Sequence, residues 1–178
     1  MDAYPKLDPA LARTAAMMAD ARSVDEVVAI LRRNARRIAG SDGIAVVLRD
    51  GDVCHYAAED AIEPLWQGCR FPLTACISGW AMLHDETVVV PDIALDPRVP
   101  RPAYANKAIC SLAMVPIGAP EPVAALGAYW CAMVLLDPMT LARIEALARQ
   151  AGDAFSRVRG EAVAEAAVPE RALQPADV

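Results

Sequence analysis

The sequence predicts a single domain that mixes α-helices with paired β-strands, and three observations support this expectation. Segments near both ends of the chain repeat apolar residues at helical spacing. Between them, two pairs of short apolar segments are joined by turn residues, which is the pattern of a β-hairpin. The length of 178 residues is ordinary for one domain and is enough to bury a sizeable core.

Two helices are predicted before the first strand. The segment 9–21 has apolar residues on one side, which indicates an amphipathic helix. The next helix follows Ser23, because Ser23 and Glu26 have the spacing of a capping box, in which both side chains accept hydrogen bonds from backbone N–H groups. Gly40 is expected to end this helix.

Strands and a short helix follow, up to a long final helix. The residues from Asp50 to Asp52 suit the turn of the first hairpin, and Asp137 and Pro138 suit the start of the last helix. The predicted elements are, in chain order, strands at 44–48 and 53–58, a loop at 59–68 with a helical turn near 64–67, a helix at 75–84, a strand at 87–90, strands at 111–117 and 124–135, and a helix at 138–158.

A turn-rich segment lies between the third and fourth predicted strands. It contains Asp92, Asp96, Tyr104 and several prolines, and it is of the kind that closes over a cavity at the edge of a sheet. In the short helix before it, Gly79 costs about 1 kcal/mol relative to alanine. We therefore expect backbone or ligand to approach Gly79 closely.

Composition and charge exclude several classes of partner and site. A net charge of −6 argues against a nucleic-acid partner, and Arg32, Arg33, Arg36 and Arg37 are interpreted as the solvated side of a helix. No secretory signal and no membrane-length apolar segment is visible, so a cytoplasmic location without membrane contact is expected. Five cysteines without a C-x-x-C pair, and two histidines away from zinc-ligand spacing, argue against a disulfide framework and a metal site.

Four motifs of this chain together resemble a GAF domain. They are F-P-L-x-x-x-I-S-G-W-A from Phe71, V-V-V-P-D-I-x-x-D-P-R from Val88, S-L-A-M-V-P-I-G from Ser111 and L-G-A-Y-W from Leu126. The resemblance covers about residues 10–158, and it is strongest to the GAF domains that precede the kinase in bacterial sensor histidine kinases.

The resemblance implies an α+β fold with a central antiparallel sheet of about five to six strands. The terminal helices would cover one face, and short helices and loops would cover a ligand on the other. Residues 1–22 are accordingly assigned to an N-terminal helical segment whose helix can join a dimer bundle, 23–159 to the GAF domain and 160–178 to a disordered tail. Because the chain stops soon after the last helix, its output is expected to pass through the terminal helices, a homodimer or a separate signalling protein.

The candidate pocket residues come from the matched motifs and from apolar or polar side chains near the turn-rich segment. They are Trp66, Phe71, Cys76, Ser78, Trp80, Asp92, Tyr104, Cys110, Met114 and Tyr129. Alternation on the last predicted strand leaves open which of two sets faces the ligand, namely Gly127, Tyr129 and Cys131 or Leu126, Ala128 and Trp130.

Several candidates also have a purely structural interpretation. Trp80 suits packing of the short helix on the sheet, and Asp92 and Asp96 suit local caps of backbone N–H groups. Cys76 and Cys110 suit small apolar core positions.

Three chemical versions of this fold are weighed against the residues, and none is expected. A bilin linkage would need a cysteine in a later helical region, whereas Cys54 and the histidine after it lie in the second strand. Haem would need an axial ligand, for which His84 is a loose candidate. Free methionine sulfoxide reductase would need cysteines where this chain has Ser78 and a residue near Ala105, with Cys69 one position away from a third.

The primary expectation is therefore a non-enzymatic bacterial sensor that binds an unidentified small molecule. One alternative is a module that has lost ligand binding and acts only through its helical dimer surface, and a less favoured alternative is the thiol-based reductase. A cyclic nucleotide would need a phosphate site, for which Arg70, Arg98 and Arg101 are candidates, although they equally suit a solvated surface.

Overall fold

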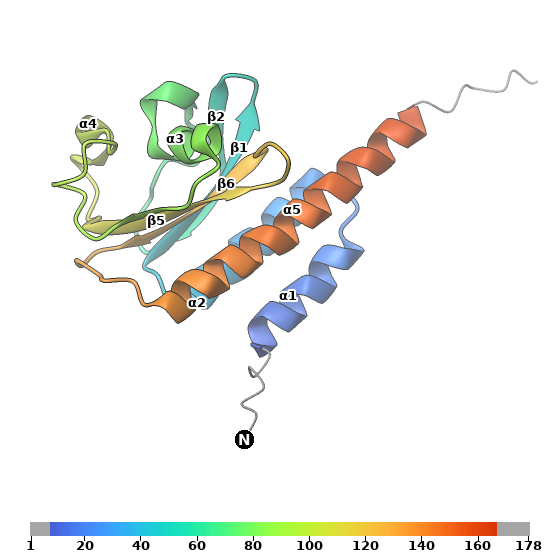
Figure 1. The fold of residues 1–178 in the computed structure, drawn as a ribbon, viewed down its shortest axis with the longest axis horizontal. Helices are drawn as coiled ribbons and strands as arrows, with labels where there is room; N and C mark the ends of the chain where they lie inside the picture. Colours follow the sequence, from blue (N-terminus) through green and yellow to red (C-terminus); the bar gives the residue numbers. More distant parts are fainter. Residues whose placement is uncertain (1–7, 167–178) are drawn as a thin grey trace, which may run out of the picture.

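The computed structural model describes residues 8–166, which form a six-stranded antiparallel sheet between two layers of helices (Figure 1). The strand order is β3-β2-β1-β6-β5-β4, so the two predicted hairpins meet where β1 pairs with β6. The strands are β1 Gly43–Asp50, β2 Val53–Ala61, β3 Arg70–Pro72, β4 Val88–Val90, β5 Ser111–Ile117 and β6 Ala124–Trp130. The helices are α1 Pro9–Asp20, α2 Val24–Ala39, the 3-10 helix η1 Leu73–Ala75, α3 Ile77–His84, α4 Arg101–Tyr104 and α5 Pro138–Ala166.

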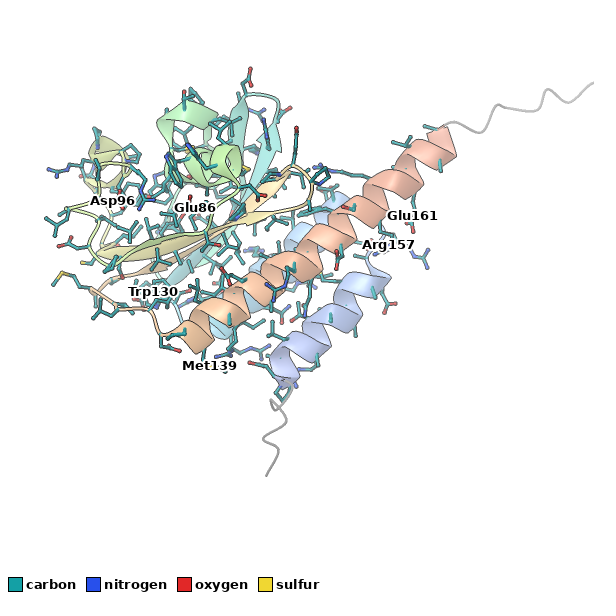
Figure 2. The ribbon with its side chains drawn as sticks, in the orientation of Figure 1. Glu86, Asp96, Trp130, Met139, Arg157 and Glu161 are labelled. Atoms are coloured by element: carbon teal, nitrogen blue, oxygen red, sulfur yellow. The ribbon has the colours of Figure 1, made fainter. Side chains whose placement is uncertain are left out.

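Helices α2 and α5 cover one face of the sheet, and α1 lies beside α5 on the outer side (Figure 1). Leu31 of α2 and Phe155 of α5 are fully buried in this layer. Figure 2 shows Arg157 on the part of α5 beside the end of α1. Its Nη2 atom donates hydrogen bonds to the carbonyl oxygens of Met18 at 2.8 Å and Ala21 at 2.6 Å, so α5 holds the C-terminal end of α1.

The ends of α2 agree with the sequence signals. Ser23 is the N-cap, and its hydroxyl oxygen accepts a hydrogen bond from the Glu26 backbone N–H at 3.2 Å. The Glu26 carboxylate reaches back to the N–H of Arg22 at 2.7 Å, one residue before the position of an ideal capping box. Gly40 ends the helix with a positive φ of 61°, which is the conformation that favours glycine.

The short helices η1, α3 and α4 lie on the opposite face of the sheet (Figure 1). Two separate apolar clusters result, one under the long helices and one under the short helices and loops. The α+β architecture expected from the sequence, with terminal helices on one face and short helices on the other, is confirmed.

Strand β6 shows which side chains belong to each face. Leu126, Ala128 and Trp130 pack with the long helices, whereas Tyr129 packs with the short helices. All residues of β6 are buried, because the strand lies near the middle of the sheet with a layer on both sides. The set that contains Gly127 and Tyr129 is therefore the one that faces the expected ligand side.

Several strands differ from the prediction, and three of these differences have clear causes. Residues 59–61 were predicted to begin a loop, but β2 continues to Ala61, because β1 begins at Gly43 and pairs with β2 from there. The predicted strand 124–135 ends at Trp130, and the next N–H, that of Cys131, donates to the Asp42 carboxylate at 2.8 Å. The edge strand Arg70–Pro72 was not predicted, because three residues show no alternation.

The C-terminal helix is longer than predicted. Residues 160–166 were assigned to a disordered tail, but they continue α5. The rest of that tail and residues 1–7 lie outside the described residues. Within residues 8–166, no helix combines the length and the apolar character that crossing a membrane requires.

Gly79 allows α3 to pack directly against η1. A Cβ atom at this position would lie 1.9 Å from the carbonyl oxygen of Leu73. The close approach expected at Gly79 is therefore an approach of backbone, and it brings Cys76 and Ser78 over the sheet.

Replacing Gly79 with alanine should lower the free energy of unfolding by about 1–3 kcal/mol, because the added methyl group forces α3 away from η1. Gly160→Ala is the matched control, since a Cβ added at Gly160 would have no neighbouring atom within 4 Å and the residue lies in an exposed part of α5. This control should stabilise the protein by up to about 1 kcal/mol. Urea unfolding measures both variants, and equal stability of Gly79→Ala and the parent chain would contradict the close packing.

Candidate functional site

The candidate pocket residues gather on the sheet face opposite the long helices, but they do not enclose one large cavity. Trp66, Phe71, Cys76 and Tyr104 line a cavity of about 10 Å³. Tyr129 lines a second cavity of about 20 Å³. A single water needs about 10–15 Å³, so each cavity has room for about one molecule of that size. The face is therefore almost closed.

An aromatic cluster centred on Trp66 fills most of this face. The Trp66 ring lies edge to face with three tyrosine rings, at centroid distances of 4.8 Å to Tyr104, 5.6 Å to Tyr129 and 5.7 Å to Tyr56. Phe71 extends the cluster and lies 5.5 Å from Tyr56. The cluster joins strands β2, β3 and β6 to the loop before β3 and to α4.

Hydrogen bonds hold the loop of Trp66 in place. The Glu59 carboxylate accepts three backbone N–H groups, from Leu65 at 3.0 Å, Trp66 at 2.9 Å and Gln67 at 2.8 Å. On the other side, Lys107 lies 5.7 Å from the Trp66 ring centroid and donates to two carbonyl oxygens of the same loop. The indole N–H of Trp66 donates to the carbonyl of Ala103 at 3.2 Å, which ties the loop to α4.

Tyr129 carries a buried hydroxyl group that has no hydrogen-bond partner among the described residues. Burial raises the pKa of Tyr129 well above its ordinary value, so the hydroxyl remains a neutral donor. Its ring occupies space that Gly127 leaves free, because a Cβ at Gly127 would lie 2.5 Å from the Tyr129 hydroxyl oxygen. A buried, unpaired hydroxyl costs free energy, so it marks a place where a ligand atom or water can bind.

A buried hydrogen-bond network connects Tyr56, Ser78 and Cys76. The hydroxyls of Tyr56 and Ser78 are 3.0 Å apart, and Ser78 Oγ donates to Cys76 Sγ at 3.3 Å. Interaction with the Cys54 thiol lowers the pKa of Cys76, and the same interaction raises the pKa of Cys54. Ser78 and nearby backbone N–H groups lower the pKa of Cys76 further, whereas burial opposes this shift.

Five of the candidate residues do not line either cavity of this face, and Ser78, described above, is one of them. Trp80 stacks on His84 with ring centroids 4.0 Å apart, and it lies under the Arg98 guanidinium. The Asp92 carboxylate accepts a hydrogen bond from the Ala94 N–H at 2.9 Å, which agrees with its interpretation as a local cap of the backbone. Cys110 is half-buried just before β5, and Met114 is fully buried on the same sheet face beside Gly127.

Hydrogen bonds and an ion pair between residues of the turn-rich segment stabilise its conformation. Asp96 accepts two hydrogen bonds from the Arg98 side chain and one from its N–H, and these bonds lower the pKa of Asp96. Figure 2 shows Asp96 in the loops on the side of the sheet away from α5. Arg101 donates to the carbonyl of Ala94 at 2.5 Å, and Arg70 pairs with Asp50. All three arginines considered for a phosphate site thus have partners within the chain.

Tyr56, Glu59 and Lys107 were missed as site residues by the sequence analysis. The face on which Tyr56 lies cannot be predicted by alternation, because a β-bulge between Val46 and Val47 shifts the pairing with β2 by one residue. This shift places Tyr56 and Ala58 on opposite faces, so simple alternation misassigns one of them. Glu59 accepts from N–H groups six to eight residues later, and Lys107 donates to carbonyl groups 42 and 43 residues earlier. No local motif indicates either set of contacts.

Two wider hollows lie outside this face. One, of about 560 Å³, lies between α5 and the β4–β5 end of the sheet and contains Glu145, Arg149 and Asp153. The other, of about 310 Å³, lies between α1 and α5 and includes Ala19. Both are open and border α5. Among residues 8–166, no group of three or more histidine, cysteine, aspartate or glutamate side chains is placed to hold a metal ion.

The sequence and the fold were compared with known proteins. A family model for the GAF domain matches residues 21–156. No curated protein sequence matches the chain. A solved structure of a free methionine-R-sulfoxide reductase from Neisseria meningitidis, in complex with its substrate, has a TM-score of 0.71 and 21% identity, with coverage of 89% of this chain and 96% of that one.

Two further solved structures have the same fold. The GAF domain from a phosphoenolpyruvate-protein phosphotransferase of Coxiella burnetii has a TM-score of 0.75 at 14% identity, covering 86% of this chain and 95% of that one. A domain assigned to a two-component sensor histidine kinase of Sinorhizobium meliloti has a TM-score of 0.64 at 14% identity, covering 82% of this chain and 99% of that one. At these identities the likeness shows the fold alone.

Glu59→Gln should lower the free energy of unfolding by about 1–3 kcal/mol. The two carboxylate oxygens of Glu59 accept three N–H groups, whereas the glutamine amide has only one accepting oxygen. Glu63→Gln is the control, since Glu63 is exposed in the same loop. Urea unfolding and tryptophan fluorescence measure the effect. An equal loss in both variants would show that charge alone, rather than the hydrogen bonds of Glu59, stabilises the loop.

Proposed function

Because this chain belongs to the GAF domain family, we propose that it is a regulatory module that binds a small molecule on the sheet face covered by α3 and α4. The unpaired hydroxyl of Tyr129 is the observation that carries the proposal. A well-packed core has little reason to bury a donor without a partner, whereas a binding site needs a donor that fixes its ligand. The proposal includes a cytoplasmic role in bacterial signal transduction.

The lining side chains define the class of ligand. Trp66, Tyr56 and Tyr104 favour a flat, mostly apolar molecule that can stack on or against aromatic rings. Tyr129 is a neutral donor, so the ligand needs an accepting oxygen or nitrogen at that end. Lys107 lines the cavity beside Tyr129 and suits a negative or strongly accepting group there. A small heteroaromatic acid or amide meets these requirements.

Binding such a ligand requires the segment from Asp92 to Cys110 to move away from the sheet, because the two cavities hold only about one water each. Few hydrogen bonds connect this segment to the loop of Trp66. They come from the Trp66 indole and from Lys107. We therefore propose that the described structure is the closed form, and that a ligand replaces these contacts when it binds.

Occupancy would reach the terminal helices through β6. Tyr129 faces the proposed ligand, and the next residue, Trp130, packs with the long helices on the other face. The indole N–H of Trp130 donates to the carbonyl of Gly40 at the end of α2, at 3.0 Å. A shift of β6 would therefore change the position of α2, and with it the surface that a homodimer or partner protein contacts.

The proposed role is regulatory rather than catalytic. Ser78 and a residue near Ala105 stand where the resemblance to free methionine sulfoxide reductases calls for cysteines, so the nucleophile of that reaction is missing from its position. The structural likeness to the Neisseria enzyme is a likeness of fold.

Tyr129→Phe tests the ligand site. The ligand-free variant should change the free energy of unfolding by less than about 1 kcal/mol, because no described residue loses a partner. Compounds from a library of small heteroaromatic acids and amides that shift the amide NMR signals of residues near Tyr129 should bind the variant about 5–20-fold more weakly. Compounds that bind both proteins equally, or no compound that binds near Tyr129, would contradict the proposed site.

A ligand-free interaction module is the second candidate, and the open hollow of about 310 Å³ between α1 and α5 favours it. Ala19→Arg places a large charged side chain at this exposed position without disturbing a buried one. If the module acts through this surface, the variant should be monomeric where the parent chain is dimeric, as measured by sedimentation equilibrium. Asp20→Arg, on the exposed side of the same helix, is the control. Unchanged association in Ala19→Arg would reject this surface.

A further inference from the structure

The segment between β4 and β5 closes on itself before it covers the proposed ligand face. The N–H of Ile93 donates to the carbonyl of Cys110 at 2.9 Å, so the ends of the loop at residues 94–109 are joined. Inside this loop, the Arg98 side chain pairs with the Asp96 carboxylate. The loop therefore has internal links of its own, and we call residues 94–109 the cover.

The cover contacts two neighbours on this face, α3 and the loop before β3. On α3, the Arg98 guanidinium lies 4.9 Å from the ring centroid of Trp80. On the loop before β3, the indole N–H of Trp66 donates to the carbonyl of Ala103 at 3.2 Å. Both contacts use side chains, so they can break without disturbing the sheet.

Lys107 makes the strongest polar contact between the cover and the loop before β3. Its ammonium donates hydrogen bonds to the carbonyl oxygens of Pro64 at 2.8 Å and Leu65 at 2.7 Å. A charged donor forms stronger hydrogen bonds than the neutral indole of Trp66. Pro64 is exposed and Leu65 is half-buried, so water can replace the lysine at these carbonyls.

Lys107 also lines the cavity that contains the unpaired hydroxyl of Tyr129. This cavity of about 20 Å³ lies between residues 61–65 and residues 107–109. Because it has room for about one water, a ligand group that binds the Tyr129 hydroxyl there also lies close to Lys107. The ammonium is thus placed to donate either to the loop carbonyls or to the ligand.

The charge of the ligand group decides which acceptor the ammonium prefers. A neutral amide oxygen resembles the backbone carbonyls, so an exchange gains little, whereas a carboxylate adds the attraction of opposite charges. Among the described residues that line the cavity, Lys107 carries the positive charge, and Asp42 and Glu63 oppose an anion. Asp42 accepts the N–H of Cys131 at 2.8 Å, and Glu63 is exposed, so solvent screens its charge.

We propose that Lys107 is the latch of the cover and that an anionic group of the ligand releases it. In the closed form, the ammonium holds the cover on the loop before β3. A carboxylate that enters beside Tyr129 attracts the ammonium away from the two carbonyls, and water takes its place there. The cover then loses its strongest polar contact with that loop and moves outward. The choice of an anion rests on the proposed ligand site, whereas the latch does not.

The latch is tested in the ligand-free protein through two indole N–H groups. That of Trp66 is bonded to Ala103 of the cover, so it exchanges with solvent when the cover opens. That of Trp130 donates to the carbonyl of Gly40 on the other face and serves as the internal reference. In Lys107→Met, NMR in D₂O should show about 5–20-fold faster exchange at Trp66 and no change at Trp130.

Arg33→Met is the matched control, because Arg33 is exposed on α2 in the opposite layer and the change removes the same charge. Both indole exchange rates should stay within about twofold of the parent. An unchanged rate for Trp66 in Lys107→Met would overturn the latch. Equal acceleration at Trp66 and Trp130 would also overturn it, because the whole domain would then be less stable.

The choice of an anion is tested with pairs of small heteroaromatic acids and their primary amides. At pH 7 the acid is ionised and the amide is neutral. Each acid that binds near Tyr129 should bind the parent at least about tenfold more tightly than its amide. In Lys107→Met this difference should fall below about twofold. Isothermal titration calorimetry measures the affinities.

The latch, the anion and the ligand site fail in different ways. Equal binding of acids and amides that still depends on Tyr129 would reject the anion and leave the ligand site standing. An acid preference that persists in Lys107→Met would reject the role of the lysine. If no compound binds near Tyr129, the ligand site and the choice of an anion fail together, and the exchange of the Trp66 indole N–H alone decides the latch.

Discussion

The structure depends on a sheet that is buried on both faces. Every residue of β6 is buried, so successive side chains belong alternately to the layer of long helices and to the layer of short helices. Tyr129 and Trp130 are neighbours in the chain, yet they pack in different layers. A central strand of this kind cannot change on one face without affecting the other. This constraint is the physical basis of the proposed coupling between a ligand on one face and the helix surface on the other.

The features that the sequence predicts well have local causes. Ser23, Gly40 and Gly79 are each explained by contacts within a few residues, namely a cap, a left-handed turn and a close backbone approach. The strand pairs were also predicted, because a hairpin needs only a turn and two alternating segments. The α+β architecture followed from the resemblance, and the structure and the family match agree with it.

The features that were missed depend on contacts between distant parts of the chain. Lys107 donates to two carbonyl groups that lie 43 and 42 residues earlier, and the Tyr56 hydroxyl meets that of Ser78, 22 residues later, only because β2 and α3 pack together. The burial of Cys76 agrees with its interpretation as a small apolar core residue. Burial alone does not describe it, because the Ser78 hydroxyl donates a hydrogen bond to its sulfur.

The two edges of the sheet have a consequence for how copies of the protein meet. Both edge strands, β3 and β4, are only three residues long, and β3 includes Pro72. Such short edges offer few unpaired backbone groups, and proline removes a donor, so they are poor templates for adding a strand from another molecule. The sheet is protected against edge-to-edge aggregation. The proposed homodimer would therefore use the sides of the helices, where side chains set the geometry of contact.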